Sequence, residues 1–273
     1  MKYIVKLLRP LNCFLASVSV PIILITLYGM ERGGWPSWTV TAIGMIVVFT
    51  FTAGGNVLND YIDRKVDRIN HPDRPISSGK ISPKSALALS GIMFVLSFSS
   101  SLLLPDILPK LIVVMAIAMI ISYELMLKKL GLSGNMIISA LTGLLFVFAG
   151  AVYGNILLPS IIGLLAGLST LGREVTKDIQ DMRGDFDRKT LPMRIGKTRS
   201  RHLVAGFVIS AVMLSPLPYL FSMLPLSYLL IVIGADIIFI YSIFHLKEPR
   251  RAQRLIKVAM SAALVAFFIG GIV

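Results

Sequence analysis

The sequence contains one cysteine, Cys13, and so it cannot form an internal disulfide. Charged residues are also scarce, because only 15% of the 273 residues are Asp, Glu, Lys or Arg, whereas 55% are hydrophobic. The mean hydropathy is +0.80. A water-soluble globule of this size needs more polar surface than this composition supplies, so the composition predicts an integral membrane protein.

The sequence also lacks the alternation of apolar and polar residues that marks a membrane-spanning strand. Its apolar residues form continuous runs, and a helix needs about 20 such residues to cross the hydrocarbon core. The fold class predicted is therefore an all-α bundle of nine transmembrane helices. The nine runs are 11–29, 38–58, 86–104, 111–127, 136–152, 156–171, 203–221, 228–244 and 256–273.

Basic residues are almost absent from one side of these predicted helices. Of the 27 Lys and Arg, all but Arg32 and Lys110 precede the first run or follow the second, fourth, sixth and eighth. Positively charged loops stay in the cytoplasm, so we expect a cytoplasmic N-terminus and a C-terminus that faces outward. A net charge of +13 can also indicate nucleic-acid binding, but that requires a soluble basic face, and we expect no nucleic-acid partner.

Acidic residues number only 14, and nine of them lie in two short segments. The two segments share the spacing D-x-x-D-x-x-x-D at an offset of 118 residues, as Asp60, Asp63 and Asp67 and as Asp178, Asp181 and Asp185. This correspondence predicts an internal repeat, 1–130 and 131–250, followed by a final helix, 251–273, in a single membrane domain.

On a helix, each segment forms a stripe of oxygen ligands. At 100° per residue, Asn56 and the three aspartates after it fall within about 60° of one another. Like charges at this spacing repel by a few tenths of a kcal/mol per pair, so an unliganded stripe costs stability. Mg²⁺ fits such a stripe, because it takes one or two carboxylates and fills its other positions with water and phosphate oxygens. The alternative is a solvated helix end.

Lys and Arg are interleaved with both stripes. Cations compete with a metal ion for carboxylates, so a site for a metal alone would exclude them. A polyanion held through bridging metal ions, such as a diphosphate, accounts for both kinds of residue. The candidate diphosphate-binding or substrate-binding residues near the stripes are Asn56, Asp60, Arg64, Arg68, Arg74 and Lys177.

The stretches "NDYIDRKVD" (59–67) with "RPISSG", and "KDIQDMRGD" (177–185) with "TLP", resemble those of the UbiA-type intramembrane prenyltransferases. The resemblance implies nine helices around a central cavity, with two Mg²⁺ ions that bind the diphosphate of a polyprenyl donor. It implies the metal ligands Asn59, Asp63, Asp67, Asp178, Asp181 and Asp185, of which Asp63, Asp67, Asp181 and Asp185 are the catalytic candidates. Arg64 and Lys177 would meet the diphosphate oxygens.

Several family members carry a Tyr-x-x-x-Lys motif after the fourth helix. Here Tyr123 and Lys128 are one residue further apart. Lys128 is therefore either a diphosphate ligand or a topology-determining cation. Asp236 lies in the middle of the run 228–244 and is either a hydrogen-bonded structural residue or a functional one.

Within the family, both stretches look most like the members that transfer a geranylgeranyl group to geranylgeranylglyceryl phosphate and form the second ether bond of archaeal membrane lipid. A phosphorylated, lipid-like acceptor suits the many cations on the predicted cytoplasmic side, including Arg9, with Asn12 beside it. The alternatives are an aromatic acceptor, such as 4-hydroxybenzoate, a naphthoate or a chlorophyllide-like ring, and a divalent-cation transporter. Prenyl chain length and oligomeric state stay open.

Overall fold

The computed structural model describes residues 2–31, 35–182 and 190–272, and in these residues it contains helices and no strands. The predicted all-α class is confirmed. Eight helices within the described ranges are long and apolar enough to cross a membrane, which makes the chain a multi-pass membrane protein. They are α2 (Pro10–Glu31), α3 (Trp38–Ile62), α5 (Pro83–Ser101), α6 (Ile107–Leu125), α7 (Leu132–Tyr153), α10 (Lys197–Leu214), α12 (Leu226–Phe244) and α13 (Pro249–Ile272).

The remaining predicted span corresponds to α8 (Leu157–Asp181), a helix of 25 residues. It packs against α7, α10 and α13 and is not among the eight apolar helices. The charged residues of the second predicted stripe occupy its last turns, from Arg173 to Asp181, and lower its hydropathy. The count of nine spans and the orientation across the membrane therefore stay predictions.

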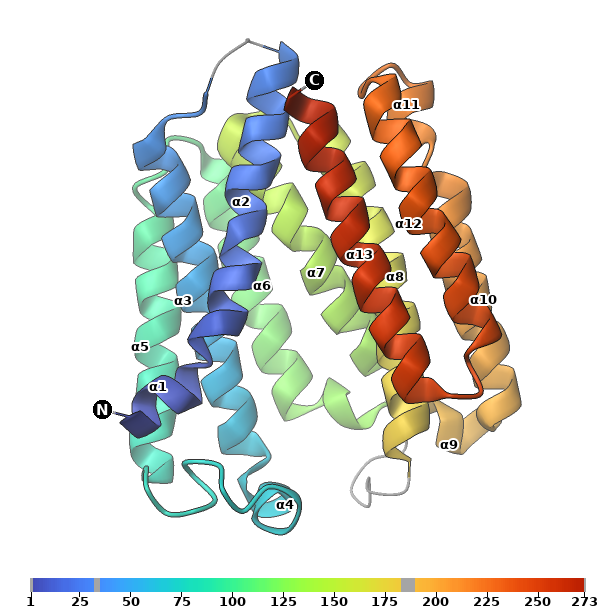
Figure 1. Cartoon of the computed structure of the whole chain (residues 1–273). Helices are drawn as coiled ribbons and strands as arrows, with labels where there is room; N and C mark the ends of the chain where they lie inside the picture. Colours follow the sequence, from blue (N-terminus) through green and yellow to red (C-terminus); the bar gives the residue numbers. More distant parts are fainter. Residues whose placement is uncertain (1, 32–34, 183–189, 273) are drawn as a thin grey trace.

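Three short helices lie at one end of the bundle. α1 (Lys2–Leu8), α4 (Arg64–Asn70) and α9 (Leu191–Ile195) lie at the lower end in Figure 1, whereas the C-terminus and α11 (Leu217–Leu220) lie at the upper end. The lower end also holds the last turns of α3 and α8. The two Asp-rich segments are therefore at the same end of the molecule.

Apolar side chains both fill the bundle and cover its outside. Leu24 of α2, Ile162 of α8 and Tyr228 of α12 are almost fully buried in one core cluster. On the outer surface, Val95 of α5 and Leu230 of α12 are 63% and 64% exposed. Large apolar surfaces of this kind are rare on soluble monomers, and lipid tails are a suitable environment for them.

A glycine pair sets the separation of α7 and α8. A Cβ atom on Gly143 would lie 2.7 Å from the carbonyl oxygen of Gly163, and a Cβ on Gly163 would lie 2.6 Å from that of Gly143. Small residues let membrane helices approach this closely. The same two helices bring Asn135 of α7 within hydrogen-bonding distance of Asp178 of α8. Their packing therefore positions Asp178, which belongs to the second Asp-rich segment.

Asp236 connects α12 to the end of α10. The hydroxyl of Ser215 donates a hydrogen bond to Asp236 Oδ2 at 2.6 Å. The hydroxyl of Tyr228 donates to the carbonyl oxygen of Ser215, also at 2.6 Å. The hydrogen bond expected for a structural Asp236 is present.

Candidate active site

The first Asp-rich segment is divided between two helices. α3 ends at Ile62 and α4 begins at Arg64, with Asp63 between them at φ −78° and ψ 0°. Asn59, Asp63 and Asp67 line a polar cavity, whereas Asn56 and Asp60 are absent from its lining. The predicted stripe from Asn56 to Asp67 is therefore divided between α3 and α4 at Asp63, and of its four residues only Asp63 and Asp67 line the cavity.

The polar cavity has a volume of about 490 Å³ and lies where both Asp-rich segments end. Asp63 and Asp67 reach it from the first segment, and Asp178 and Asp181 reach it from α8. Its remaining lining residues are Arg9, Asn59, Val66, His71, Arg74, Tyr123, Lys128, Lys177, Gln180 and Arg250. Carboxylates and cations thus share one cavity, as the sequence predicted.

Asp60 anchors two of the cavity's arginines. Its carboxylate is buried, with Oδ1 2.5 Å from Arg9 Nη2 and 3.3 Å from Arg74 Nη1. Arg74 Nη1 also contacts Asp67 Oδ2 at 2.5 Å. Charge-assisted hydrogen bonds of this kind are strong and directional, so Asp60 fixes guanidinium groups beside the cavity.

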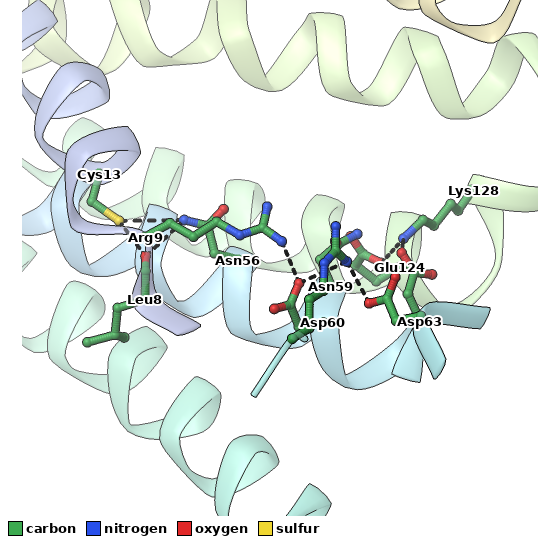
Figure 2. Close-up of polar contacts among 11 residues, drawn as sticks. Leu8, Arg9, Cys13, Asn56, Asn59, Asp60, Asp63, Glu124 and Lys128 are labelled. Atoms are coloured by element: carbon green, nitrogen blue, oxygen red, sulfur yellow. Dashed lines mark hydrogen bonds and ion pairs between the residues drawn. The ribbon is translucent and has the colours of Figure 1, made fainter. Parts of the chain in front are cut away.

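Arg9 has a strained backbone. It joins α1 to α2 with φ at 53°, and Pro10 follows it, although the residue before a proline favours extended conformations. A left-handed residue other than glycine costs roughly 1–2 kcal/mol. Asn56 stabilises this junction, because its Nδ2 donates to the carbonyl oxygen of Leu8 at 3.1 Å and lies 3.6 Å from Cys13 Sγ (Figure 2). Strain at a residue that lines a cavity is typical of a functional position.

Lys128 forms ion pairs with two carboxylates. Its Nζ lies 2.7 Å from Asp63 Oδ2 and 2.9 Å from Glu124 Oε2 (Figure 2). The other oxygen of Glu124 accepts a hydrogen bond from Asn59 Nδ2 at 2.9 Å. The short helix η1 (Leu127–Lys129) carries Lys128 into the cavity lining despite the longer spacing from Tyr123.

On α8, Asp178 Oδ2 accepts a hydrogen bond from Asn135 Nδ2 at 2.8 Å. Glu174 forms an ion pair with Arg173 and lies 4.0 Å from Lys177 Nζ. Asp178, Asp181 and Lys177 line the cavity as the sequence suggested. Asp185, the last predicted ligand of this segment, lies outside the described residues.

Three further candidates are not part of the cavity lining. Arg64 donates to the carbonyl oxygen of Tyr61 at 2.7 Å, and its guanidinium lies over the Tyr61 ring. The side chains of Arg68 and Asn12 are exposed. Their roles in substrate binding, like those of Asn56 and Asp60, stay predictions.

The structure adds residues that the candidate set omitted. His71, Gln180 and Arg250 line the cavity, and Glu124 and Asn135 hold lining residues in place. Glu124 had a signal in the sequence, because an acid near the end of an apolar run is unusual. The remaining four approach the cavity from connections or helix ends whose contacts no local spacing reveals.

The chemistry of the lining fits Mg²⁺ together with a diphosphate. Asn59, Asp63, Asp67, Asp178 and Asp181 offer the oxygen donors that hard cations prefer. Over the described ranges, no three His, Cys, Asp or Glu residues converge closely enough to hold a metal ion on their own. Mg²⁺ usually binds one or two carboxylates and takes its other ligands from water and phosphate oxygens, so these side chains suit the ion together with a phosphorylated ligand.

Comparison with known proteins gives a consistent result. Residues 19–269 match the model of the UbiA prenyltransferase family. Two similar curated relatives are the digeranylgeranylglyceryl phosphate synthases of Methanosphaera stadtmanae and Halobacterium salinarum. The first is 36% identical over 98% of this chain and 98% of the relative, and the second is 37% identical over 99% and 97%.

Solved structures share the fold over the whole chain. One, described as digeranylgeranylglyceryl phosphate synthase in membranes, is 35% identical, with a TM-score of 0.86 and coverage of 99% and 98%. A UbiA homolog from Archaeoglobus fulgidus bound to GPP and Mg²⁺ is 16% identical, with a TM-score of 0.68 and coverage of 99% of each chain. The second likeness concerns the fold alone.

Proposed function

The chain belongs to the UbiA prenyltransferase family, and on that premise we propose that it transfers a geranylgeranyl group from geranylgeranyl diphosphate to the free hydroxyl of geranylgeranylglyceryl phosphate. The products are diphosphate and a lipid with the second ether bond of archaeal membrane lipid. The names of the relatives, which match this chain from end to end, support this acceptor. Membership of a prenyltransferase family decides against the divalent-cation transporter.

One observation carries the proposal. Two Asp-rich segments that are 118 residues apart in the sequence line a single cavity, together with Arg9, Arg74 and Lys128. Carboxylates that face cations across a cavity at the end of a membrane bundle suit a substrate with a charged head and an apolar tail. A prenyl diphosphate has this form.

The cations of the cavity act on the leaving group. As the allylic C–O bond of the donor breaks, negative charge develops on the diphosphate, and guanidinium or ammonium groups at fixed positions stabilise it. Bound Mg²⁺, held by Asn59, Asp63, Asp67, Asp178 and Asp181, would add positive charge to the same oxygens. The acceptor hydroxyl oxygen then bonds to the allylic carbon and loses its proton, which completes the ether.

The prenyl chain needs apolar space next to the polar cavity. Two apolar cavities of about 230 and 330 Å³ lie in the bundle, and Thr142 and Leu145 of α7 line both of them. We assign the donor and acceptor chains to this region, because burial of hydrocarbon in an apolar cavity also keeps water from the carbocation. The smaller cavity also has polar lining residues, among them Ser19, Ser169 and Asp236.

The phosphate of the acceptor would bind at the cytoplasmic end of the bundle. Arg9 and Arg250 lie on the lining there, beside the exposed start of α2. Concentration of Lys and Arg at this end supports a cytoplasmic orientation. Donor and acceptor head groups would then both be drawn from the cytoplasmic leaflet.

The test is diphosphate release by the purified protein with geranylgeranyl diphosphate and Mg²⁺, with and without geranylgeranylglyceryl phosphate. Asp63→Asn and Asp181→Asn remove one charge from each half of the cavity and should abolish release. Glu248→Gln is the matched control, because Glu248 is an exposed carboxylate paired at 3.7 Å with Arg251 outside the cavity lining.

We expect release to require the glyceryl phosphate and to survive only in the wild type and the control. Equal release by the two aspartate variants would contradict the assigned cavity. Release with 4-hydroxybenzoate or a naphthoate, and none with the glyceryl phosphate, would keep the cavity and move the chain to an aromatic acceptor.

A further inference from the structure

Glu124 is a charged residue at an unusual place. It lies at the end of the apolar helix α6 and is 4% exposed. A buried carboxylate is unfavourable unless charges and hydrogen bonds compensate it. Both of its oxygens have partners, Asn59 at Oε1 and Lys128 at Oε2, each at 2.9 Å. Both partners line the polar cavity, whereas Glu124 itself does not.

The contact with Asn59 fixes the orientation of an amide. A carboxylate only accepts hydrogen bonds, so the atom of Asn59 that faces Glu124 must be Nδ2. The amide is planar, and its Oδ1 therefore points away from Glu124. Oδ1 is the atom of this side chain that can ligate a cation.

The contact with Lys128 fixes an ammonium group. Nζ has three N–H donors, and Asp63 and Glu124 accept two of them at 2.7 and 2.9 Å. Among the described residues these are its hydrogen-bond partners, so one donor is left for an anionic ligand in the cavity that Lys128 lines. Without Glu124, Lys128 would pair with Asp63 alone and neutralise a carboxylate that the metal needs.

We infer that Glu124 is a positioning residue, which orients Asn59 Oδ1 toward the metal and shares Lys128 with Asp63 so that this ammonium meets the diphosphate. The inference rests on the proposed function, because it concerns the metal and diphosphate of the same cavity. Glu124 touches neither. It acts through Asn59 of α3 and Lys128 of η1, because each oxygen of its carboxylate accepts a hydrogen bond from one of these side chains (Figure 2).

Glu124→Gln is the informative variant. Its side chain keeps the volume of glutamate, yet its amide can accept from only one of the two donors and presents N–H groups to the other. The matched control is Asp106→Asn, an exposed carboxylate at the opposite end of the same helix. Loss of a residue that orients metal ligands typically weakens metal binding about 10–100-fold.

Binding is measured without turnover. Mn²⁺ replaces Mg²⁺ and is followed by electron paramagnetic resonance, with the wild-type chain or a variant in detergent and geranylgeranyl thiolodiphosphate as an uncleaved donor. We expect Glu124→Gln to raise the Mn²⁺ dissociation constant about 10-fold or more and Asp106→Asn to leave it unchanged. Unchanged binding in Glu124→Gln would overturn the inference. A wild type that binds no thiolodiphosphate would instead overturn the proposed function.

A purely structural role is separated by epistasis. In a chain that carries Asn59→Ala and Lys128→Met, Glu124 has lost both of its partners, and adding Glu124→Gln should change binding by less than about twofold. An undiminished effect in that background would show that Glu124 acts through the fold.

If Glu124→Gln alone does not fold, Glu124→Met with Lys128→Met replaces the buried pair by apolar groups, a change that proteins often tolerate. It should bind Mn²⁺ more weakly than Lys128→Met, because Asn59 has also lost its partner; equal binding would contradict the inference.

Discussion

The close approach of α7 and α8 at Gly143 and Gly163 gives a prediction whose magnitude follows from the structure. In Gly143→Ala the new methyl carbon would lie 2.7 Å from the carbonyl oxygen of Gly163, whereas ordinary contacts begin at 3.4 Å. The two helices must therefore separate by about 0.7 Å, because the backbone fixes the position of the Cβ and the oxygen itself belongs to the backbone, so neither atom can rotate away.

Two effects of opposite sign determine the result. Overpacking of this kind costs about 1–3 kcal/mol. Alanine is a better helix former than glycine by about 1 kcal/mol, and this gain partly offsets the cost. Gly91→Ala in α5 isolates the second effect, because no atom lies within 4 Å of the added Cβ. The free energy of unfolding of the two variants should differ by about 1–3 kcal/mol, with Gly143→Ala the less stable.

Thermal unfolding in the same detergent measures this difference. A change of 1 kcal/mol shifts Tm by about 2–4 °C in chains of roughly this size. Prenyl transfer should fall in Gly143→Ala and not in Gly91→Ala, because α7 and α8 hold the Asn135 to Asp178 hydrogen bond. If Gly143→Ala were as stable and as active as Gly91→Ala, the reasoning about helix separation would be refuted.

Three further variants test other contacts. Asp60→Asn removes the charge that anchors two arginines, and we expect about a tenfold lower kcat/KM for the prenyl donor; an unchanged kcat/KM would contradict the anchoring role. Asn135→Ala removes the hydrogen bond to Asp178 and should raise the Mg²⁺ concentration for half-maximal activity about tenfold. An unchanged Mg²⁺ concentration would show that Asn135 does not position Asp178 for the metal. Ser215→Ala leaves Asp236 without this donor and should lower the free energy of unfolding by about 1–3 kcal/mol in thermal unfolding, a loss that Asp236→Ala added to it should partly reverse.

The fold was predictable from local sequence because a bilayer imposes its length on each helix. Continuous apolar runs located most of the long helices to within about four residues, including the fourth and fifth, which begin at Ile107 and Leu132. α8, α10 and α13 extend six to ten residues beyond their apolar runs, into segments that contain charged residues. α8 differs from the other long helices in composition, because it begins with apolar residues and ends with charged ones. Hydropathy averages the two parts and cannot separate an inner helix that carries site residues from a span.

Only the part of the candidate site that follows a regular spacing of residues along the sequence was predictable. The repeated D-x-x-D-x-x-x-D spacing identified both groups of aspartates, and four of the six line one cavity: Asp63, Asp67, Asp178 and Asp181. Spacing does not report which face of α3 meets the cavity, and Asp60 contacts Arg9 and Arg74 without being part of the lining. Residues that contact the site from another helix, such as Asn135 of α7, follow no periodic pattern in the sequence that would identify them.

Lys128 shows why motif spacing and position in space can disagree. One additional residue after Tyr123 would turn a lysine by 100° on a continuous helix and remove it from the cavity. Here α6 ends at Leu125, Met126 has a non-helical φ of −130°, and the 3₁₀ turn of η1 begins at Leu127. The longer connection places Lys128 against Asp63 and Glu124. The additional residue is therefore compensated by the change of helix type, and the electrostatic pairing, more than the residue count, determines where the ammonium lies.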